Sequence, residues 1–436
     1  MPWLARDPVS VGMETTRQAR LPLTGIRVLD FSMVWAGPMC TRALADLGAE
    51  VIKIEATVRY DPERGPAAGG RGRLYPEGIP GERPYNRAGR FNEYNRGKLG
   101  ITLDLKRSEG RSLVRELVRV SDLVVENFSA GVLDRLGLAY SELARLRPDS
   151  ILISMPGFGN SGPEAHHVAY GPTQEAMSGL SGITGYAGGS PMLTGVFYGD
   201  PVGGTFAAVA AVTALWRRRH TGAGAHIDLS QQEALASLLP ELLLDYQFNE
   251  RILTPRGNRN PAIAPHGCYR CKGEDAWVVI AVEDDAQWRT LCRVMVRSDL
   301  ADEPRLATSF RRLRCHDELD ELIAAWTRTR DHYEVMHELQ GAGISAQAVL
   351  NTAEVFQDPQ YRERGFFQEV RHVESGTYPH ASAAWRSSGV FPPIRRAAPC
   401  LGEHNSLVLG DLLGLSAKAL ERLEVDGVIG TEPVSN

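Results

Sequence analysis

The sequence has few cysteines and no long hydrophobic run, and both absences restrict what it can encode. Six cysteines are scattered over 436 residues, which is not the pattern of a disulfide framework. No run of about 18 apolar residues occurs, so no transmembrane helix is expected. The charged N-terminus lacks the apolar core of a secretory signal. We therefore predict a cytoplasmic protein with reduced thiols.

The chain also has no excess of basic residues. The formal net charge is -5, which gives no reason to expect a nucleic-acid partner. The sequence contains no Gly-x-Ser-x-Gly elbow and no Walker loop. Histidine and carboxylate residues do not cluster at ligand spacing, so no metal is expected. The composition, 43% hydrophobic and 23% charged, is that of a globular protein with a sizeable core.

Short apolar stretches alternate with helical segments over the first half of the chain. The predicted strands are residues 25–31, 51–55, 101–105, 123–127, 150–154 and 226–229. A helix at 38–47 between the first two strands makes a βαβ unit, whose strands are parallel. The alternation predicts a doubly wound, Rossmann-like α/β domain. Anions bind such domains at helix N-termini, beside the carboxyl ends of the strands.

The length predicts two or three domains. We expect a tail at 1–21, the first part of a large domain at 22–235, a smaller α+β domain at 250–340, and a C-terminal part at 350–428 that completes the large domain. The pattern predicts one long helix over 230–248, a hairpin over 268–281, and short strands that begin the C-terminal part at 343–349. The irregular loop 56–97 is long enough to be functional or mobile.

Two motif matches fail on their context. Gly157–Gly162 fits the dinucleotide pattern Gly-x-Gly-x-x-Gly, but Pro163 follows where a helix should open, so we predict a structural turn. Cys268 and Cys271 would point to opposite faces of a strand. A second cysteine pair is missing, and zinc is therefore not expected.

One acid stands in the glycine-rich stretch 195–204, just before an alanine-rich segment. Asp200 is followed by Pro201, and this pair is a common start for a helix, with the acid as N-cap. A carboxylate among glycines at a helix start is also a candidate nucleophile for covalent catalysis. The residues of this stretch alone leave both interpretations open.

Five blocks, in order along the chain, resemble the signature of the family III CoA-transferases. They are Leu23–Phe31 with Trp35–Pro38 and Leu47–Glu55, Asn95–Lys98 with Leu103–Lys106, Val125–Phe128 with Leu133–Gly137, Tyr198–Asp200 with Gly203 and Gly204, and Leu401–His404. The resemblance implies that Asp200 is the nucleophile. It also implies a homodimer of interlocked chains that binds acyl-CoA and a carboxylic acid.

The resemblance further implies which residues contact CoA. These are Val34, Trp35, Ala36, Leu103, Lys106, Asn127 and Arg135. The reaction it implies moves CoA from an acyl-CoA donor to a free carboxylic acid through an aspartyl-CoA thioester. Backbone N–H groups of Gly203 and Gly204 at a helix start would stabilise the developing oxyanions.

The chain departs from the family at several positions. Ala56 replaces a basic residue that many members have, and Arg59 or Arg64 is the expected substitute. Trp35 and Gly171 replace a glutamine and a second acid of the formyl-transferring members, so formyl and oxalyl chemistry is not expected.

Two other functions stay open as alternatives. The α-methylacyl-CoA racemases of the same superfamily use a histidine base where this chain has Tyr170 and Gly171, and neither suits α-proton abstraction near neutral pH. The other alternative is a non-catalytic CoA-binding subunit of a hetero-oligomer. For the substrate, the arginines of loop 59–96 are either solvated or bind a second carboxylate, as in a dicarboxylic acid such as succinate.

Overall fold

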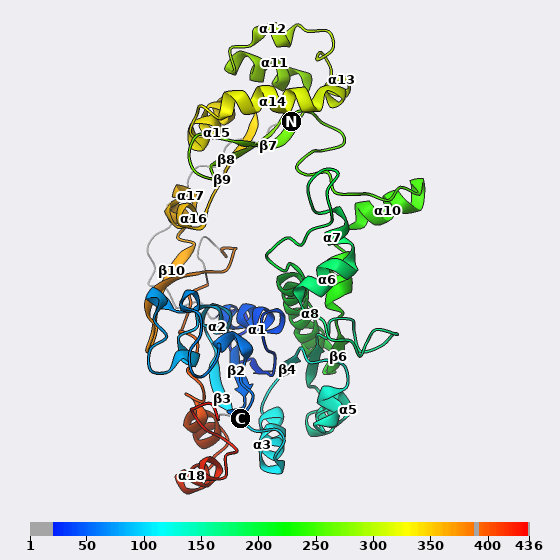
Figure 1. Cartoon of the computed structure of the whole chain (residues 1–436). Coiled ribbons are helices and arrows are strands. Elements are labelled where there is room, and N and C mark those ends of the chain that lie inside the picture. The colour runs from blue at the N-terminus through cyan, green and yellow to red at the C-terminus, as the bar shows by residue number, and fades with distance from the viewer. Residues whose placement is uncertain (1–20, 388–391, 435–436) are drawn as a thin grey trace, which may run out of the picture. The chain divides into compact units, whose positions relative to one another are not determined.

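Six parallel strands form the main sheet of the computed structural model, which describes residues 21–387 and 392–434. The strand order is β3-β2-β1-β4-β5-β6, and Figure 1 labels β3, β2, β4 and β6 of this sheet. The strands are β1 (Arg27–Asp30), β2 (Glu50–Glu55), β3 (Leu99–Thr102), β4 (Leu123–Glu126), β5 (Ile151–Ser154) and β6 (Ala225–Asp228). The predicted α/β class is confirmed, whereas the expected tail at 1–21 lies outside the described residues except for Leu21.

Helices cover both faces of this sheet because its strands are apolar on both sides. Val28 packs with α1 (Ala36–Asp46) and α8 (Gly199–Thr221), while Leu29, the next residue, packs with α3 (Ser108–Arg119) and α5 (Tyr140–Leu146) on the other face. The chain reverses its direction across the sheet between β1 and β4, which are hydrogen-bonded neighbours. Ligands of open α/β sheets bind at such a switch point, beyond the carboxyl ends of the strands.

The chain divides into two compact units. The first contains the chain up to Val168, Asp200–Gln231 and the chain from Gln368 onward; the second contains Ala169–Gly199 and Gln232–Phe367. This division differs from the expected domain boundaries in two ways. The second unit includes 169–199, and it extends over 232–367, beyond the expected small domain at 250–340 and into the expected C-terminal part at 350–428. Among the described residues, no helix is long and apolar enough to span a membrane.

The second unit has its own sheet and core. Strands β7 (His266–Arg270), β8 (Trp277–Ala281) and β9 (Ser345–Val349) pair antiparallel in that order. Its helices are α6 (Gly171–Ser178), α7 (Leu180–Ile183), α9 (Gln231–Ala236, which starts in the first unit), α10 (Pro240–Asn249), α11 (Asp285–Val294), α12 (Ser298–Ala301), α13 (Ser309–Arg312), α14 (His316–Thr327), α15 (His332–Gly341), α16 (Thr352–Gln357) and α17 (Pro359–Arg364). The predicted hairpin is therefore present as β7 and β8.

The remaining elements belong to the first unit. The helices are α2 (Gly89–Asn95), α4 (Val132–Arg135), α18 (Ala417–Val425) and the π-helix η6 (Ser406–Leu412), and the 3-10 turns are η1 (Pro62–Arg64), η2 (Gly72–Leu74), η3 (Pro76–Gly78) and η4 (Pro84–Asn86). Strands β10 (Phe367–His372) and β11 (Gly376–Ala381) form a hairpin. The first residue of β10, Phe367, is assigned to the second unit. The turn η5 (Leu313–Cys315) lies in the second unit. Val408 and Leu409 of η6 pack into the core of the main sheet.

Two expected elements were wrong. The predicted long helix over 230–248 is broken into α9 and α10, because Pro240 has no N–H to continue the helical hydrogen bonds and begins a new helix instead. The strand expected to open the C-terminal part, β9, pairs with β8 and so belongs to the second sheet.

The dinucleotide-like glycines form a turn, as predicted. Gly159 and Gly162 have positive φ angles of 81° and 93°. No helix opens after Gly162, and the next helix along the chain, α6, begins at Gly171.

Helices α1 and α8 cross where Gly204 leaves no room for a side chain. A Cβ atom at Gly204 would lie 2.5 Å from the Ala36 carbonyl oxygen and 2.8 Å from Cβ of Met39. Real Cβ atoms do not approach backbone that closely, so the second turn of α8 meets the first turn of α1 only because residue 204 is glycine.

We predict that Gly204→Ala destabilises the protein although alanine is the better helix former. Forcing the two helices apart should cost roughly 1–3 kcal/mol, which exceeds the gain of about 1 kcal/mol in helix propensity. Denaturant unfolding of the variant checks this. Thr205→Ala, at an exposed neighbour on the same helix, is the control, and equal stability of Gly204→Ala and the wild type would refute the close contact.

Candidate functional site

The turn between β1 and α1 holds a strained backbone at the switch point of the sheet. Val34 has a φ of 68°, which is rare for a β-branched residue. Asn127, directly after β4, fixes the turn with both amide atoms: it accepts from the Met33 N–H and donates to the Met33 carbonyl, each at 2.8 Å. A Cβ at Gly37 would lie 2.1 Å from Cβ of Ser32, so only glycine fits there.

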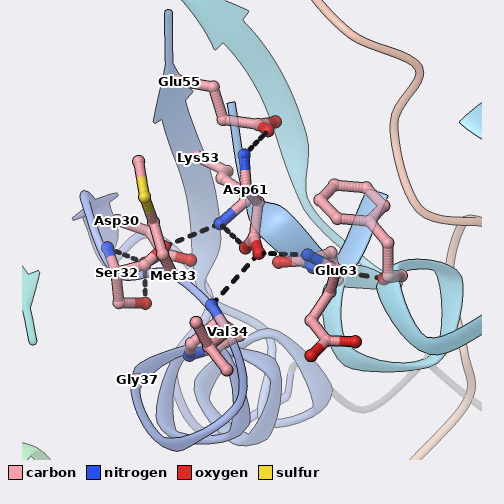
Figure 2. Close-up of polar contacts among 12 residues, drawn as sticks. Asp30, Ser32, Met33, Val34, Gly37, Lys53, Glu55, Asp61 and Glu63 are labelled. Carbon is pink, nitrogen blue, oxygen red and sulfur yellow. Dashed lines mark hydrogen bonds and ion pairs between the residues drawn. The ribbon is translucent and has the colours of Figure 1, made fainter. Parts of the chain in front are cut away.

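Buried charges beneath this turn hold it in place (Figure 2). Lys53 Nζ donates to the Ser32 carbonyl at 2.7 Å and lies 3.0 Å from Asp61 Oδ2. Asp61 Oδ1 accepts from the Val34 N–H at 3.1 Å and from the Glu63 N–H at 3.0 Å. Asp61 thereby satisfies the amide of the strained residue, which has no helical or strand partner.

A second buried pair lies beside the first. Lys98 Nζ is 2.8 Å from Asp30 Oδ2, and both side chains are fully buried. Burial alone would raise the pKa of Asp30, but the charges of Lys98 and Lys53 outweigh burial and lower it to about 2. Burial lowers the pKa of Lys98 to about 8 despite Asp30, because Lys53 adds a second positive charge nearby. Asp30 thus serves as a shared counter-ion for two lysines.

Asp200 lies in the first turn of α8, and the next turn of this helix packs against the start of α1 through the contact of Gly204 with Ala36. Because α8 begins at Gly199, Asp200 is already helical and is not the N-cap residue that its pairing with Pro201 suggested. Trp35 stacks on Tyr94 with ring centroids 5.2 Å apart. Burial, the charge of Glu63 and the charge of Asp200 raise the pKa of Tyr94 to about 12, so Asp200 lies near that phenol.

The loop that leads to Asp200 is tied down by a buried acid of the second unit. Glu175 is fully buried on α6. Its carboxylate accepts from the Thr194 N–H at 3.1 Å, the Thr194 hydroxyl at 2.7 Å and the Tyr198 N–H at 2.7 Å. These bonds stabilise the glycine-rich loop two residues before Asp200.

The structure brings together one group of the residues expected to contact CoA. Val34, Trp35, Ala36 and Asn127 share the strained turn. Leu103 follows β3, but its side chain is fully buried in the core, so only its backbone is available to a ligand. Lys106 and Arg135 are exposed after β3 and β4 respectively, at the edge of the sheet where phosphates bind such folds.

Arg64 is not the substitute for a basic residue at position 56. It is fully buried, and Nε and Nη2 donate to the two oxygens of Glu55 at 2.8 Å each. Its other donors reach the Tyr85 carbonyl, Asn86 Oδ1 and the Pro399 carbonyl. No N–H group of this guanidinium is left for a phosphate, which leaves Arg59 as the expected substitute.

The start of α8 determines which backbone N–H groups could stabilise an oxyanion. An α-helix leaves the N–H groups of its first four residues without partners inside the helix. In α8 these residues are 199–202, of which Pro201 has no N–H. Gly203 and Gly204 come next, where the N–H groups bond to carbonyls four residues before. Because both residues are glycines, Gly203 can pack closely against Gln231 and Gly204 can pack closely against α1.

Sequence reasoning missed Tyr94, Lys53, Asp61 and Glu175. Lys53 alternates with apolar residues in a strand, and only the neighbouring carboxylates reveal why it is buried. Asp61 and Tyr94 both belong to the stretch 56–97 that the sequence predicts to be an irregular loop, and Tyr94 lies on its short helix α2. Glu175 stands within a helix and carries no motif of its own.

A separate polar cluster lies at the carboxyl ends of β4, β5 and β6. Ser154 bonds Glu126 and lies 3.1 Å, through Oγ, from Nε2 of His226. Tyr140 stacks on His226 with centroids 5.4 Å apart. Burial raises the pKa of Glu126 to about 7, against the hydrogen bonds from Ser154 and the Phe128 N–H. Glu126 directly precedes Asn127, so this cluster supports the residue that fixes the strained turn.

The fold and the site define an α/β protein that binds its ligand at the carboxyl edge of the sheet and carries an acid at the start of a nearby helix. Comparison with known proteins makes this specific. The family model described as CoA-transferase family III matches residues 23–405. The chain belongs to this family, and the predicted membership is confirmed. It is accordingly an acyl-CoA:carboxylate CoA-transferase.

Relatives extend over nearly the whole chain. A succinyl-CoA:D-citramalate CoA-transferase of Chloroflexus aurantiacus is 35% identical over 96% of this chain and all of that protein. A succinate:glutarate CoA-transferase of Agrobacterium fabrum is 33% identical over 90% of this chain and 96% of that protein. The crystal structure of a CAIB/BAIF family protein from Brucella suis matches with a TM-score of 0.81 and 31% identity, over 90% of this chain and 100% of that one.

We predict that Glu126 makes stability fall as the pH rises from 5 to 8. A carboxyl whose pKa is raised on folding binds its proton more tightly in the folded state. The stability that this group contributes is fully present below the pKa of the unfolded state, and it is lost as the pH rises through about 7. The loss should approach roughly 3 kcal/mol. Glu126→Gln, whose amide cannot ionise, should not show this loss of stability.

Denaturant unfolding of both proteins at pH 5 and pH 8 measures this difference. The exposed Glu116→Gln on α3 is the matched control and should follow the wild type. If Glu126→Gln and the wild type lost the same stability between the two pH values, the raised pKa would be refuted.

Proposed function

We propose that the chain transfers CoA between carboxylic acids through a covalent thioester on Asp200. The observation that carries this proposal is the placement of Asp200. Its carboxylate stands on the first turn of a helix that packs against the strained turn of Val34, Trp35 and Ala36. A carboxylate nucleophile needs no general base, which suits a position with Tyr94 as its neighbour.

The reaction consists of four balanced displacements. An Asp200 oxygen attacks the donor thioester carbonyl, the C–S bond breaks, and a mixed anhydride and CoA thiolate form. The thiolate attacks the Asp200 acyl carbon, and the donor leaves as its free carboxylate. The acceptor carboxylate then attacks the aspartyl-CoA thioester and releases thiolate, which attacks the acceptor carbonyl and regenerates Asp200. No proton is gained or lost in any step.

Each step develops an oxyanion that needs fixed donors. We assign this role to the N–H groups at the first turn of α8, supported by the dipole of a 23-residue helix. Gly203 and Gly204 contribute by allowing this turn to approach α1. For CoA, we propose backbone contacts at Val34–Ala36 and Leu103, a contact at Asn127, and phosphate binding by Lys106 and Arg135.

We propose dicarboxylic acids as the substrate class. The relatives at 35% and 33% identity are named for succinyl-CoA with D-citramalate and for succinate with glutarate. Succinate, D-citramalate and glutarate are dicarboxylates, and the acyl group of succinyl-CoA keeps one free carboxylate. Other relatives near 30% identity are named formyl-CoA:oxalate CoA-transferases, but Trp35 and Gly171 depart from that branch. The racemase alternative lacks a base, since Tyr170 is exposed and Gly171 begins α6.

We also propose that the protein is a homodimer. Four large apolar side chains on α8, namely Phe206, Val209, Val212 and Trp216, are exposed at 41%, 63%, 39% and 65%. Their spacing of three to four residues places them on one helix face. An exposed apolar stripe of this kind marks an interaction surface, and the protein's own second copy is the expected partner, in a cytoplasmic enzyme that binds only small molecules otherwise.

We predict that Asp200→Asn abolishes CoA exchange, by at least about 1,000-fold, because an amide is no nucleophile for the thioester. CoA binding by calorimetry should stay close to wild type, since the phosphate contacts are untouched. With donor alone, intact-protein mass spectrometry should find the CoA adduct on the wild type and none on the variant. Asp411→Asn, at an exposed position, is the control.

Mass spectrometry of the variant must first exclude deamidation of Asn back to Asp. Retained turnover in the intact variant would refute the mechanism. So would uptake of solvent deuterium at the α-carbon of a branched acyl-CoA without an adduct, which is the result a racemase gives.

The dimer has its own test. Light scattering of the purified protein should give twice the chain mass of 47.8 kDa. Val209→Arg should weaken the dimer, because it buries a charge in the apolar stripe. Val425→Arg on α18, at a position 81% exposed, is the matched control. A wild-type monomer at micromolar concentration would contradict the proposal.

A further inference from the structure

We propose that Arg90 binds the far carboxylate of the acyl group, and that this contact makes the enzyme select dicarboxylic over monocarboxylic substrates. The inference rests on the proposed function, because it assigns the substrate class to the same site. Arg90 is one of several arginines in the loop between β2 and β3, and the structure supports this assignment by its position and by the partners that hold four of the others.

Four arginines of this loop already have structural partners. The donors of Arg64 are all used within the protein, as described above. Arg96 is buried and paired with Asp46. Arg83 lies 2.8 Å from Glu374, and Arg87 donates to the Glu374 carbonyl. These side chains hold the loop against the C-terminal segment and are not available to a substrate.

Arg90 differs from them in exposure and in its partner. Its side chain is 64% exposed, and its guanidinium lies 3.7 Å from Glu63 Oε2. Among the described residues, Glu63 is the only carboxylate paired with it. A single contact on one side orients the guanidinium, while its remaining N–H groups can accept a bidentate carboxylate.

Position links Arg90 to the nucleophile. Arg90 and Tyr94 lie four residues apart on α2, so their side chains share one face of the helix. Tyr94 stacks on Trp35 with the ring planes 7° apart. The charges of both Arg90 and Asp200 act on the Tyr94 phenol in opposite directions. Tyr94 therefore shares its helix with this exposed cation and stacks on Trp35, whose neighbour Ala36 contacts the helix that carries Asp200.

The other cation near Tyr94 does not fit the role. Arg42 also acts on the phenol, but its side chain is only 14% exposed and lies 2.8 Å from Glu93. It also donates to Met39 Sδ at 3.0 Å. Arg42 is thus held on α1 by its own partners, which leaves Arg90 as the accessible cation beside Tyr94.

The arrangement recognises both ends of a short dicarboxylic acyl group. The thioester carbonyl meets Asp200, the methylene carbons lie along the Trp35–Tyr94 ring pair, and the free carboxylate meets Arg90. Glu63 is anchored by the buried charges through its N–H bond to Asp61, so the same network that holds Val34 also sets the position of Arg90. A monocarboxylic acyl group would leave the guanidinium without its anionic partner.

The experiment compares succinyl-CoA with butyryl-CoA, which has the same chain length but no second carboxylate. Adduct formation on Asp200 with each donor is measured first, and steady-state transfer to the matching acid follows. The wild type should prefer succinyl-CoA. Arg90→Gln should lower kcat/KM for succinyl-CoA roughly 10- to 100-fold, mainly through KM, and leave butyryl-CoA transfer within about twofold. Arg90→Lys should recover part of the loss.

Arg83→Gln, the partner of Glu374 in the same loop, is the matched control and should leave the donor preference unchanged. An equal loss on both donors, or an unchanged preference in Arg90→Gln, would overturn the role of Arg90 while an adduct on Asp200 upholds the proposed function. If no donor gives an adduct on the wild type, the proposed function itself fails, and with it this inference.

Discussion

The site depends on one buried ion pair, between Lys53 and Asp61. Both side chains are fully buried, and their atoms lie 3.0 Å apart. Asp61 holds the Val34 amide and the Glu63 amide, and Lys53 holds the Ser32 carbonyl. Removing one partner would leave an uncompensated buried charge, at a cost of roughly 3–5 kcal/mol, and would free the strained backbone. The pair therefore keeps Val34 in a conformation that the residue would not adopt alone.

The residues that this pair holds lie on two sides of the site. On one side the fixed turn presents Trp35 and the start of α1, against which α8 brings Asp200. On the other side Glu63 extends to Arg90, while Tyr94 joins the two sides. Asp200 and Arg90 are the two charges that we assign to the acyl substrate, and the buried charges hold the backbone around them. This division explains why so many ionised groups lie beneath a site whose proposed chemistry uses a single carboxylate.

Much of the fold was predictable from the sequence because the strands are apolar on both faces and short turns separate them from helices. The error at 230–248 came from treating Leu238–Leu244 as one apolar helix, although Pro240 interrupts it. At the site, resemblance pointed to Val34–Ala36, Asn127 and Asp200. Arg64 and Tyr94 could not be assigned, because the loop 56–97 has no periodicity, and only the fold determines which of its side chains find a buried partner.

The central claim is that the Asp200 carboxylate itself carries the acyl group and the CoA. Transfer to an acceptor acid labelled with heavy oxygen in its carboxylate tests this most directly. The acceptor oxygen that attacks the aspartyl thioester becomes the bridging oxygen of the second anhydride and stays on Asp200 when thiolate attacks the acceptor. Peptide mass spectrometry should therefore find one heavy oxygen in the peptide that contains Asp200 after a single turnover, and up to two after many turnovers. A peptide without label, after full conversion of the acceptor to its CoA ester, would contradict the account.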